Sequence, residues 1–214
     1  MTLRERIDRI IHAGEIELAG EAYKGKYELN DVRSIKDFIL KKLRKIYINL
    51  STSDKMTLSH DSAGKLAIQY KDSEAYQKSI AHIPEIIENM QFLEEMEPSK
   101  ENAKYDKYSY YITPVNIDGE FHTILSTVGH KGQKIYYSQN VFRGTPKEVF
   151  ANAKNETDNT KYIRLNEILK DIYNKNSDWE LYQGSTQGSP TAVESTNAST
   201  NKYTKNSSDM QGKV

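Results

Sequence analysis

The segment from residue 60 to residue 65 places an imidazole, a hydroxyl and a cation close together. His60, Ser62 and Lys65 lie within one or two turns of each other if the segment is helical. An imidazole titrates near neutral pH and serves as a general acid or base. An ammonium group stabilises the charge that develops on a phosphate. This combination suits phosphodiester chemistry, although His60 is also typical of a turn and Lys65 of a solvated surface.

A second polar group lies on two later segments that we expect to be strands. His122, Ser126 and His130 are separated by even numbers of residues, so they share one face of a strand. Tyr137 or Ser138 of the following strand can join them. These residues are equally typical of the outer face of a sheet, and both interpretations stay open.

Tyrosine is unusually frequent, with 15 tyrosines against five phenylalanines. A tyrosine contributes apolar area and a polar hydroxyl, which favours half-buried and binding surfaces. Two doublets, Tyr110-Tyr111 and Tyr136-Tyr137, lie on expected strands. They fit either a nucleotide-binding face or ordinary cross-strand packing.

These side chains supply what a metal-free ribonuclease needs. The ribose 2′-OH is the nucleophile, and the protein adds a general base, a general acid and cations for the phosphate. We predict that His60 acts as base or acid and that Lys65 holds the phosphate. The predicted catalytic residues are His60, Lys65, His122, Ser126 and Tyr137, and the predicted substrate-binding residues are Ser62, Tyr111, His130 and Ser138.

Other classes of chemistry find little support in the sequence. There is no HExxH, P-loop, GxSxG or dinucleotide-binding glycine motif. The chain has no cysteine, and its five histidines are not paired at metal-ligand spacing. We therefore expect neither a metal nor a cofactor.

Composition bounds the setting of the protein. The 214 residues carry 30 basic and 30 acidic side chains, a balance that argues against a dedicated nucleic-acid scaffold but allows a small basic cleft. The first residues lack the apolar core of a signal peptide, and no stretch has the length of a membrane-spanning helix. We expect a cytoplasmic protein of a bacterial host cell that does not contact a membrane.

Helical periodicity dominates the first half of the chain. We expect helices at 2–18, where Thr2 and Glu5 form a capping box, and from Asn30 or Asp31 onward. The second helix places Ile35, Phe38, Ile39, Leu43 and Ile46 on one face and Lys36, Lys41, Lys42, Arg44 and Lys45 on the other. That basic face is either a solvated surface or a stripe that faces phosphates.

The centre of the chain is expected to alternate between a strand at 47–52, a strand or turn leading into a helix within 55–70, and a long helix at 73–96. Pro84 interrupts that helix, so we expect it to end near His82 and to restart with Pro84 in its first turn.

The second half predicts a β-meander. Strands are expected at 108–117, 120–130 and 134–142, with Asp118-Gly119 as a type I′ hairpin turn. Short helices at 145–154 and 162–173 follow. The residues from 179 onward are poor in apolar side chains, and we expect 184–214 to be disordered. The fold class is α+β, with N-terminal helices packed on a small antiparallel meander. The expected domains are a helical region at 1–50, an α+β module at 51–178 and a tail at 179–214.

Several of these segments together resemble a known family. The run Ile83-Pro84-Glu85-Ile86-Ile87-Glu88-Asn89, then Tyr110-Tyr111, Ile117-Asp118-Gly119-Glu120 and Ile135-Tyr136-Tyr137, resembles large polyvalent protein-associated domains of phages and other mobile elements. Those domains look related to phage barnase-EndoU-colicin-RelE-like nucleases. The resemblance spans roughly 58–141 and implies an α+β module with RNA cleavage. Where the family often has Asp-His, this chain has Ser138-Gln139.

Two hypotheses from different classes follow. The first is a metal-independent endoribonuclease, a toxin or host-takeover effector with RNA as substrate and an antitoxin or immunity protein as partner. The alternative is a non-catalytic module that docks a protein or a nucleic acid. Convergence of His60 and Lys65 on the face of His122 or Tyr137 would favour the enzyme. The sequence does not indicate an oligomeric state.

Overall fold

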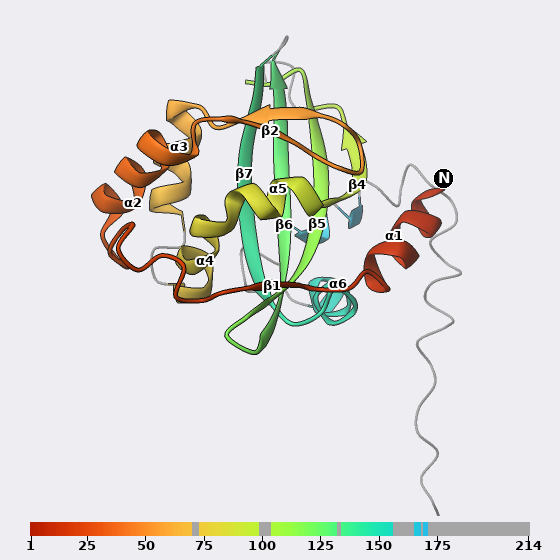
Figure 1. Cartoon of the computed structure of the whole chain (residues 1–214). Coiled ribbons are helices and arrows are strands. Elements are labelled where there is room, and N and C mark those ends of the chain that lie inside the picture. The colour runs from red at the N-terminus through yellow and green to blue at the C-terminus, as the bar shows by residue number, and fades with distance from the viewer. Residues whose placement is uncertain (70–72, 99–103, 132–133, 156–164, 168, 171–214) are drawn as a thin grey trace, which may run out of the picture.

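A computed structural model describes residues 1–69, 73–98, 104–131, 134–155, 165–167 and 169–170 (Figure 1). The predicted α+β class is confirmed. The elements, in chain order, are α1 (Leu3–Ile11), β1 (Ile16–Leu18), α2 (Val32–Phe38), the π-helix η1 (Ile39–Leu43), β2 (Ile46–Ile48), β3 (Lys55–Thr57), α3 (His60–Ile68), α4 (Glu74–Ser79), the 3-10 helix η2 (Ile80–His82), α5 (Ile83–Asn89), β4 (Gln91–Met96), β5 (Lys107–Ile117), β6 (Glu120–Lys131), β7 (Lys134–Arg143) and α6 (Pro146–Asn155).

The three long strands β5, β6 and β7 form the antiparallel centre of the sheet, as predicted. Asp118 and Gly119 join β5 to β6 with φ angles of 55° and 81°. These positive φ angles are what a type I′ hairpin turn requires.

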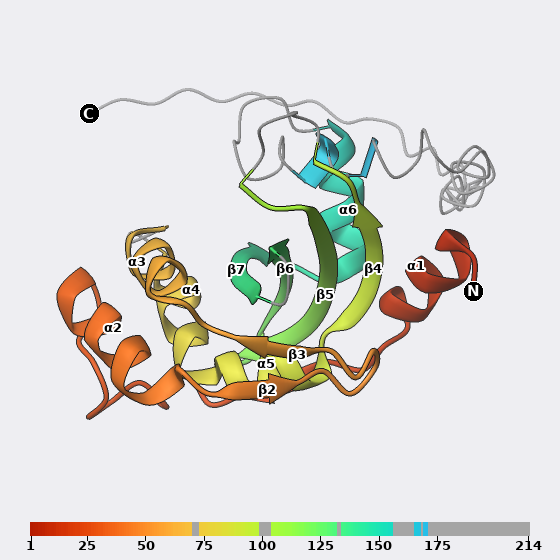
Figure 2. The ribbon, with the colours of Figure 1, turned by 90° about the horizontal axis from the view of Figure 1, so that it is seen from above.

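The sheet as a whole is mixed, so the prediction of a simple antiparallel meander is wrong. The strand order is β1-β5-β6-β7-β3-β2, and β4 pairs with β5 beside β1. β1 runs parallel to β5, and β3 runs parallel to β7. The added strands β1, β2 and β3 have three residues each, too few for an alternating pattern to appear in the sequence. Figure 2 shows that the sheet is curled, with β2 and β3 turned away from the direction of β4.

The N-terminal helix is shorter than predicted. The Thr2 and Glu5 capping box is present, but α1 ends at Ile11. Residues Ile16–Leu18 instead form β1 against Val115–Ile117 of β5. The apolar residue at position 18 therefore packs as part of a strand in the core, which helical spacing alone did not reveal.

The second helix begins as predicted and ends earlier. Asp31 is its N-cap, accepting hydrogen bonds from the backbone N–H groups of Arg33 and Ser34. The helix widens into the π-helix η1, which ends at Leu43. Ile46, predicted on the apolar face of this helix, lies on β2 and is 71% exposed. The predicted strand at 47–52 is replaced by the shorter β2, with β3 after it.

The long predicted helix at 73–96 is divided. It breaks after His82, and Pro84 lies in the first turn of α5, as expected. Contrary to prediction, α5 ends at Asn89 and the chain continues as β4. The side-chain amide of Asn49 donates 2.8 Å hydrogen bonds to the carbonyls of Ile87 and Met90. This contact from a distant loop satisfies the last carbonyls of the helix, so the helix ends there.

The strands separate two cores. The first core lies on the side of α2, α3, α4 and α5 and includes Tyr111 and Tyr137. The second core lies on the side of α1 and α6 and includes Tyr110 and Phe142. Because successive side chains of a strand point to opposite faces, neighbouring residues of β5 and β7 serve different cores.

The helix predicted at 145–154 is present as α6. Of the helix predicted at 162–173, residues 165–167 and 169–170 are described as helical, with Leu165 and Leu169 buried in the second core. The tail predicted at 179–214, with disorder from 184, lies outside the described residues. The division of the chain at residue 50 stays a prediction.

Candidate functional site

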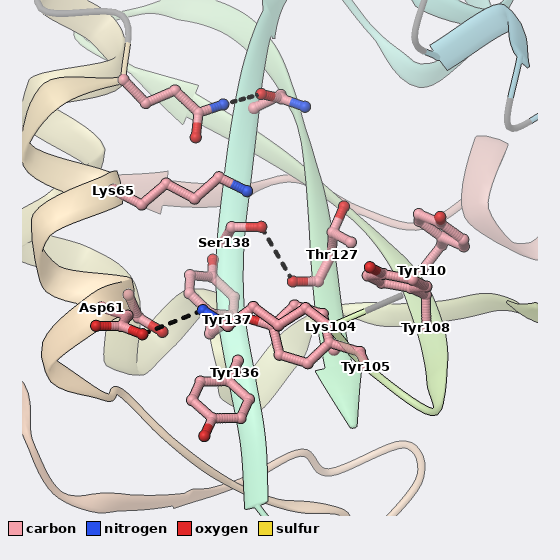
Figure 3. Close-up of a pocket in the computed structure, with 14 residues that line it drawn as sticks. Asp61, Lys65, Lys104, Tyr105, Tyr108, Tyr110, Thr127, Tyr136, Tyr137 and Ser138 are labelled. Carbon is pink, nitrogen blue, oxygen red and sulfur yellow. Dashed lines mark hydrogen bonds and ion pairs between the residues drawn. The ribbon is translucent and has the colours of Figure 1, made fainter. Parts of the chain in front are cut away.

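A pocket lies between α3 and the face of β5, β6 and β7 that continues into the second core. Its volume is about 410 Å³, within the roughly 300–1,000 Å³ of small-ligand sites. Figure 3 shows the side chains that line this pocket. The lining residues are Asp61, Ser62, Lys65 and Gln69 of α3 and its C-cap, Lys104 and Tyr105 of the segment before β5, Tyr108 and Tyr110 of β5, Thr127 and Gly129 of β6, and Tyr136, Tyr137, Ser138 and Asn140 of β7.

Helix α3 presents polar side chains to this pocket at helical spacing. Asp61, Lys65 and Gln69 are four residues apart, so they follow one another along one face. Ser59 caps the helix by accepting a 3.0 Å hydrogen bond from the backbone N–H of Ser62. The opposite face of α3 carries Leu66 and other apolar residues of the first core. Core packing therefore fixes which face of α3 looks at β7.

Tyrosine rings form a second wall. The ring centroid of Tyr105 lies 5.0 Å from that of Tyr136 and 5.5 Å from that of Tyr108. The Tyr105 ring also lies directly over Gly129, where an added Cβ would be 2.7 Å from a ring carbon. The absence of a side chain at position 129 therefore allows Tyr105 to lie flat against the sheet.

Two lysines bring positive charge to the pocket. The Nζ of Lys104 lies 3.1 Å from a carboxylate oxygen of Asp61, and 5.4 and 5.7 Å from the ring centroids of Tyr105 and Tyr136. The hydrogen bond to Asp61 raises the pKa of Lys104, so this lysine stays protonated at neutral pH. Lys65 reaches from α3 toward β7, beside Ser138, as Figure 3 shows.

The opposite face of the same strands is a closed core. The Tyr137 hydroxyl donates a 2.7 Å hydrogen bond to Oε1 of Gln139 and lies 3.2 Å from the Ser126 hydroxyl. The Gln139 amide in turn donates to the hydroxyl of Ser79 at 2.7 Å. Burial strongly raises the pKa of Tyr137. Ser126 and Tyr137, predicted as catalytic, have their hydroxyls in this network on the far side of the sheet from the pocket.

A polar cluster lies at the solvent end of that same face. Nε2 of His130 is 2.8 Å from the hydroxyl of Ser109, which lies 3.3 Å from a carboxylate oxygen of Glu95. Lys107 forms a 2.7 Å ion pair with the same oxygen. Burial, followed by the charge of Lys107, lowers the pKa of His130. We call these four residues the His130 cluster.

Tyr111 lies next to that cluster in the first core. Its hydroxyl donates a 2.8 Å hydrogen bond to Oδ2 of Asp54 in the loop between β2 and β3. Burial strongly raises its pKa, with the Asp54 carboxylate acting in the same direction. The predicted substrate-binding role of Tyr111 therefore has no counterpart in the pocket.

The two remaining predicted histidines lie elsewhere. His60 is the first residue of α3 and is exposed, but it is not among the pocket-lining residues. His122 lies near the hairpin end of β6, where its Nδ1 is 2.9 Å from the carbonyl of Glu120. Neither is among the described residues that line the pocket with Lys65 and Tyr137, so the histidine part of the convergence that would favour the enzyme hypothesis is not seen there.

The structure thus assembles part of the predicted site. Ser62, Lys65 and Ser138 line one pocket. Tyr137 also lines it, although its hydroxyl is hydrogen-bonded to Gln139 in the first core. Sequence analysis missed Lys104, Tyr105 and the pair Gln69 and Asn140. The four-residue spacing of Asp61, Lys65 and Gln69 was a usable signal, whereas Lys104 and Tyr105 precede β5 in a segment without any periodic pattern.

The fold and this pocket define an α+β domain with a lysine- and tyrosine-lined site. The chain belongs to the family described as large polyvalent protein-associated domain 3, which matches residues 27–137, just over half of its length. The predicted family is thereby confirmed, while a relationship to nucleases stays a prediction. No curated protein and no solved structure matches the chain.

None of the helices in the described part of the chain is long and apolar enough to cross a membrane. Among the described residues, histidine, aspartate and glutamate side chains nowhere gather in groups of three or more that could hold a metal ion.

Proposed function

We propose that this domain is a binding module that holds a short segment of single-stranded nucleic acid in the pocket between α3 and β7. The observation that carries the proposal is the convergence of Lys65 and Lys104 with the rings of Tyr105, Tyr108 and Tyr136 on one concave surface. Proteins that bind single strands combine cations that follow the backbone with aromatic rings on which bases stack.

The balance of charge within the pocket supports an anionic ligand. Asp61 is the one carboxylate among the described residues that line the pocket, and it forms an exposed ion pair with Lys104. Exposed ion pairs of this kind are weak because water competes for both partners. A phosphate group can therefore take the place of Asp61 beside Lys104 at little cost.

The remaining lining groups fit a nucleotide better than an apolar peptide. Ser138, Thr127 and Asn140 offer hydroxyl and amide groups next to the tyrosine rings. A folded duplex would hide the base faces that such rings contact, whereas a single strand exposes them. We therefore favour single-stranded RNA or DNA over duplex and over a protein partner.

Fluorescence anisotropy with labelled single strands of about ten nucleotides tests this proposal, a length within the range bound by small single-strand modules. Wild type should bind, and Lys65→Gln/Lys104→Gln should bind at least about tenfold more weakly, with a shallower dependence on salt. The control Lys24→Gln/Lys147→Gln removes the same charge from exposed positions outside the pocket. Equal affinity in wild type and the pocket variant, or preference for duplex, would overturn the proposal.

Metal-independent RNA cleavage is a second candidate, and the His130 cluster is the observation that favours it. The His130 imidazole and the Glu95 carboxylate both contact the hydroxyl of Ser109, and the Lys107 ammonium group contacts the same carboxylate. They correspond to the acid, base and phosphate-binding groups that attack by the ribose 2′-OH requires. We call the pocket between α3 and β7, lined by Lys65, Lys104 and Tyr136, the strand pocket. The His130 cluster lies on the opposite face of the sheet, so each proposal can be tested without the other.

Total RNA incubated with protein and a chelator tests this second candidate. The candidate is supported if wild type cleaves RNA and both His130→Ala and Glu95→Gln do not. His60→Ala is the matched control, because it removes the histidine that was predicted from the sequence. RNA that stays intact with wild type would remove it and leave the binding proposal unaffected.

A further inference from the structure

Two amide side chains meet at the wall of the strand pocket and leave part of their hydrogen-bonding capacity unused. Gln69 follows the last turn of α3, and Asn140 lies on β7. The amide nitrogen of Gln69 donates a 2.5 Å hydrogen bond to Oδ1 of Asn140. Both residues line the pocket. They therefore form a bridge between the helix and the strand at the site.

One atom of this bridge is an orphan. Oε1 of Gln69 is buried and accepts no hydrogen bond from any residue that the structure describes. A buried acceptor without a partner is unfavourable because it has lost its hydrogen bonds to water and gained none in return. Such groups are rare in folded proteins, and an absent ligand is one of their explanations.

The other half of the bridge offers the complementary group. Asn140 uses its oxygen in the contact with Gln69, while its Nδ2 donates to no residue in the described part of the chain. The pair thus leaves one acceptor and one donor without a partner in the described part of the chain, and a ligand reaches the buried acceptor when the Gln69 side chain turns toward the pocket. Turning both amides over exchanges the two roles but preserves one of each, so the argument does not depend on their orientation.

An acceptor beside a donor matches the edge of a nucleobase. Adenine carries an amino group next to a ring nitrogen, which is the donor and acceptor pair that asparagine and glutamine side chains contact in nucleic acids. Adenine is also a large flat purine suited to stacking on tyrosine rings, and Tyr136 and Tyr108 line the same pocket.

We propose that Gln69 and Asn140 read the edge of an adenine in the bound strand. The amino group of the base donates to the orphan oxygen of Gln69, and a ring nitrogen accepts from Asn140. Lys65 and Lys104 hold the phosphates without distinguishing bases. This inference rests on the proposed strand binding and adds base selectivity to the same site.

The test compares strands that differ in one chemical group. Wild type is titrated with an adenine-containing single strand and with the same strand carrying purine, which lacks the amino group. We expect wild type to lose about 5- to 150-fold in affinity on removal of the amino group. Gln69→Met, which keeps the length of the side chain but removes its acceptor, should bind both strands with similar affinity. Asn140→Leu is a second variant with the same expectation, and thermal unfolding verifies that both variants fold.

Lys65→Gln serves as the matched control, because loss of a phosphate contact should weaken both strands equally. If wild type binds both strands equally, or Gln69→Met keeps the preference, base reading is overturned while strand binding stands. If wild type binds no strand at all, the proposed function fails and this inference fails with it.

Discussion

The two tyrosines of the doublet Tyr136-Tyr137 are adjacent in sequence and opposite in role. Tyr137 is 1% exposed, and its hydroxyl belongs to a hydrogen-bonded chain inside the first core. Tyr136 is half-buried, lies against Tyr105, and faces the strand pocket on the other side of the sheet. The same residue type thus stabilises the fold at one position and builds a surface at the next, because strand side chains alternate between faces.

The difference also separates two kinds of polar group. Ser126, Gln139 and Ser79 have found partners within the core. In the pocket, Gln69 has a buried oxygen without a partner among the described residues. A satisfied network holds a core in one arrangement, whereas the unsatisfied oxygen of Gln69 is the group to which we propose that a base binds.

The largest expected effect tests the core side of this comparison. Tyr137→Ala should lower the free energy of unfolding by about 3–5 kcal/mol, the usual cost of removing a buried aromatic ring. Tyr136→Ala should lower it by about 1 kcal/mol or less. Urea unfolding followed by circular dichroism measures both. Similar losses in the two variants would contradict the assignment of the two faces.

For binding, we expect the opposite order: substitution of Tyr136 should have a larger effect than substitution of Tyr137. Tyr136→Ala should weaken single-strand binding by about 1–3 kcal/mol, because a ring on which a base stacks is lost. Tyr137→Phe, which removes only the buried hydroxyl, should leave the affinity of the folded protein unchanged. Anisotropy titrations at fixed salt give both values. A Tyr136→Ala variant with unchanged affinity would argue against stacking at this position.

A smaller effect on stability is expected at Gly129 of β6, which lies under the Tyr105 ring of the pocket. Gly129→Ala places a methyl group against the Tyr105 ring, since the added Cβ would lie 2.7 Å from it. The ring must shift, and such overpacking costs about 1–3 kcal/mol of stability when the surroundings resist. Because Tyr105 borders the pocket, its ring has space to shift, so we expect the lower end of that range together with weaker strand binding. Gly64→Ala on α3, where an added Cβ meets nothing within 4 Å, is the matched control.

The smallest effect concerns pH and the His130 cluster. Burial and Lys107 lower the pKa of His130, against the opposing charges of Glu95 and Asp54. The unfolded chain then binds a proton more readily, so stability is full above the ordinary histidine pKa and is lost as pH falls below it. Between about pH 7.5 and about pH 5.5, within the range where histidine changes charge, wild type should lose more stability than His130→Gln. Parallel loss in the two proteins would show that other groups carry the pH dependence.

Long, regular elements were predictable because their patterns repeat. The three central strands, the turn at Asp118-Gly119 and the break before Pro84 all carry local signals and are present. The three-residue strands and β4 carry no such signal. Their positions depend on residues far away in the sequence. For example, Asn49 donates hydrogen bonds to the carbonyls of Ile87 and Met90 at the end of α5, where β4 begins.

The candidate site was predictable only where a helix carried it. Lys65 and Ser62 were singled out with the correct element, and Ser138 with the correct strand. The histidines were chosen for their chemistry, yet His60, His122 and His130 lie at three separate places. Residue type indicates what a side chain is able to do, but it contains no information on which side chains meet.

By itself, the sequence determined the α+β class, the family to which the chain belongs, and the elements whose periodicity is long enough to repeat. The tertiary structure decided which face of each strand is core and which is pocket. The physical reason lies in α3, whose apolar face packs into the first core and thereby turns Asp61, Lys65 and Gln69 toward β7. Only that packing brings an alternating strand and a helical stripe together as one site.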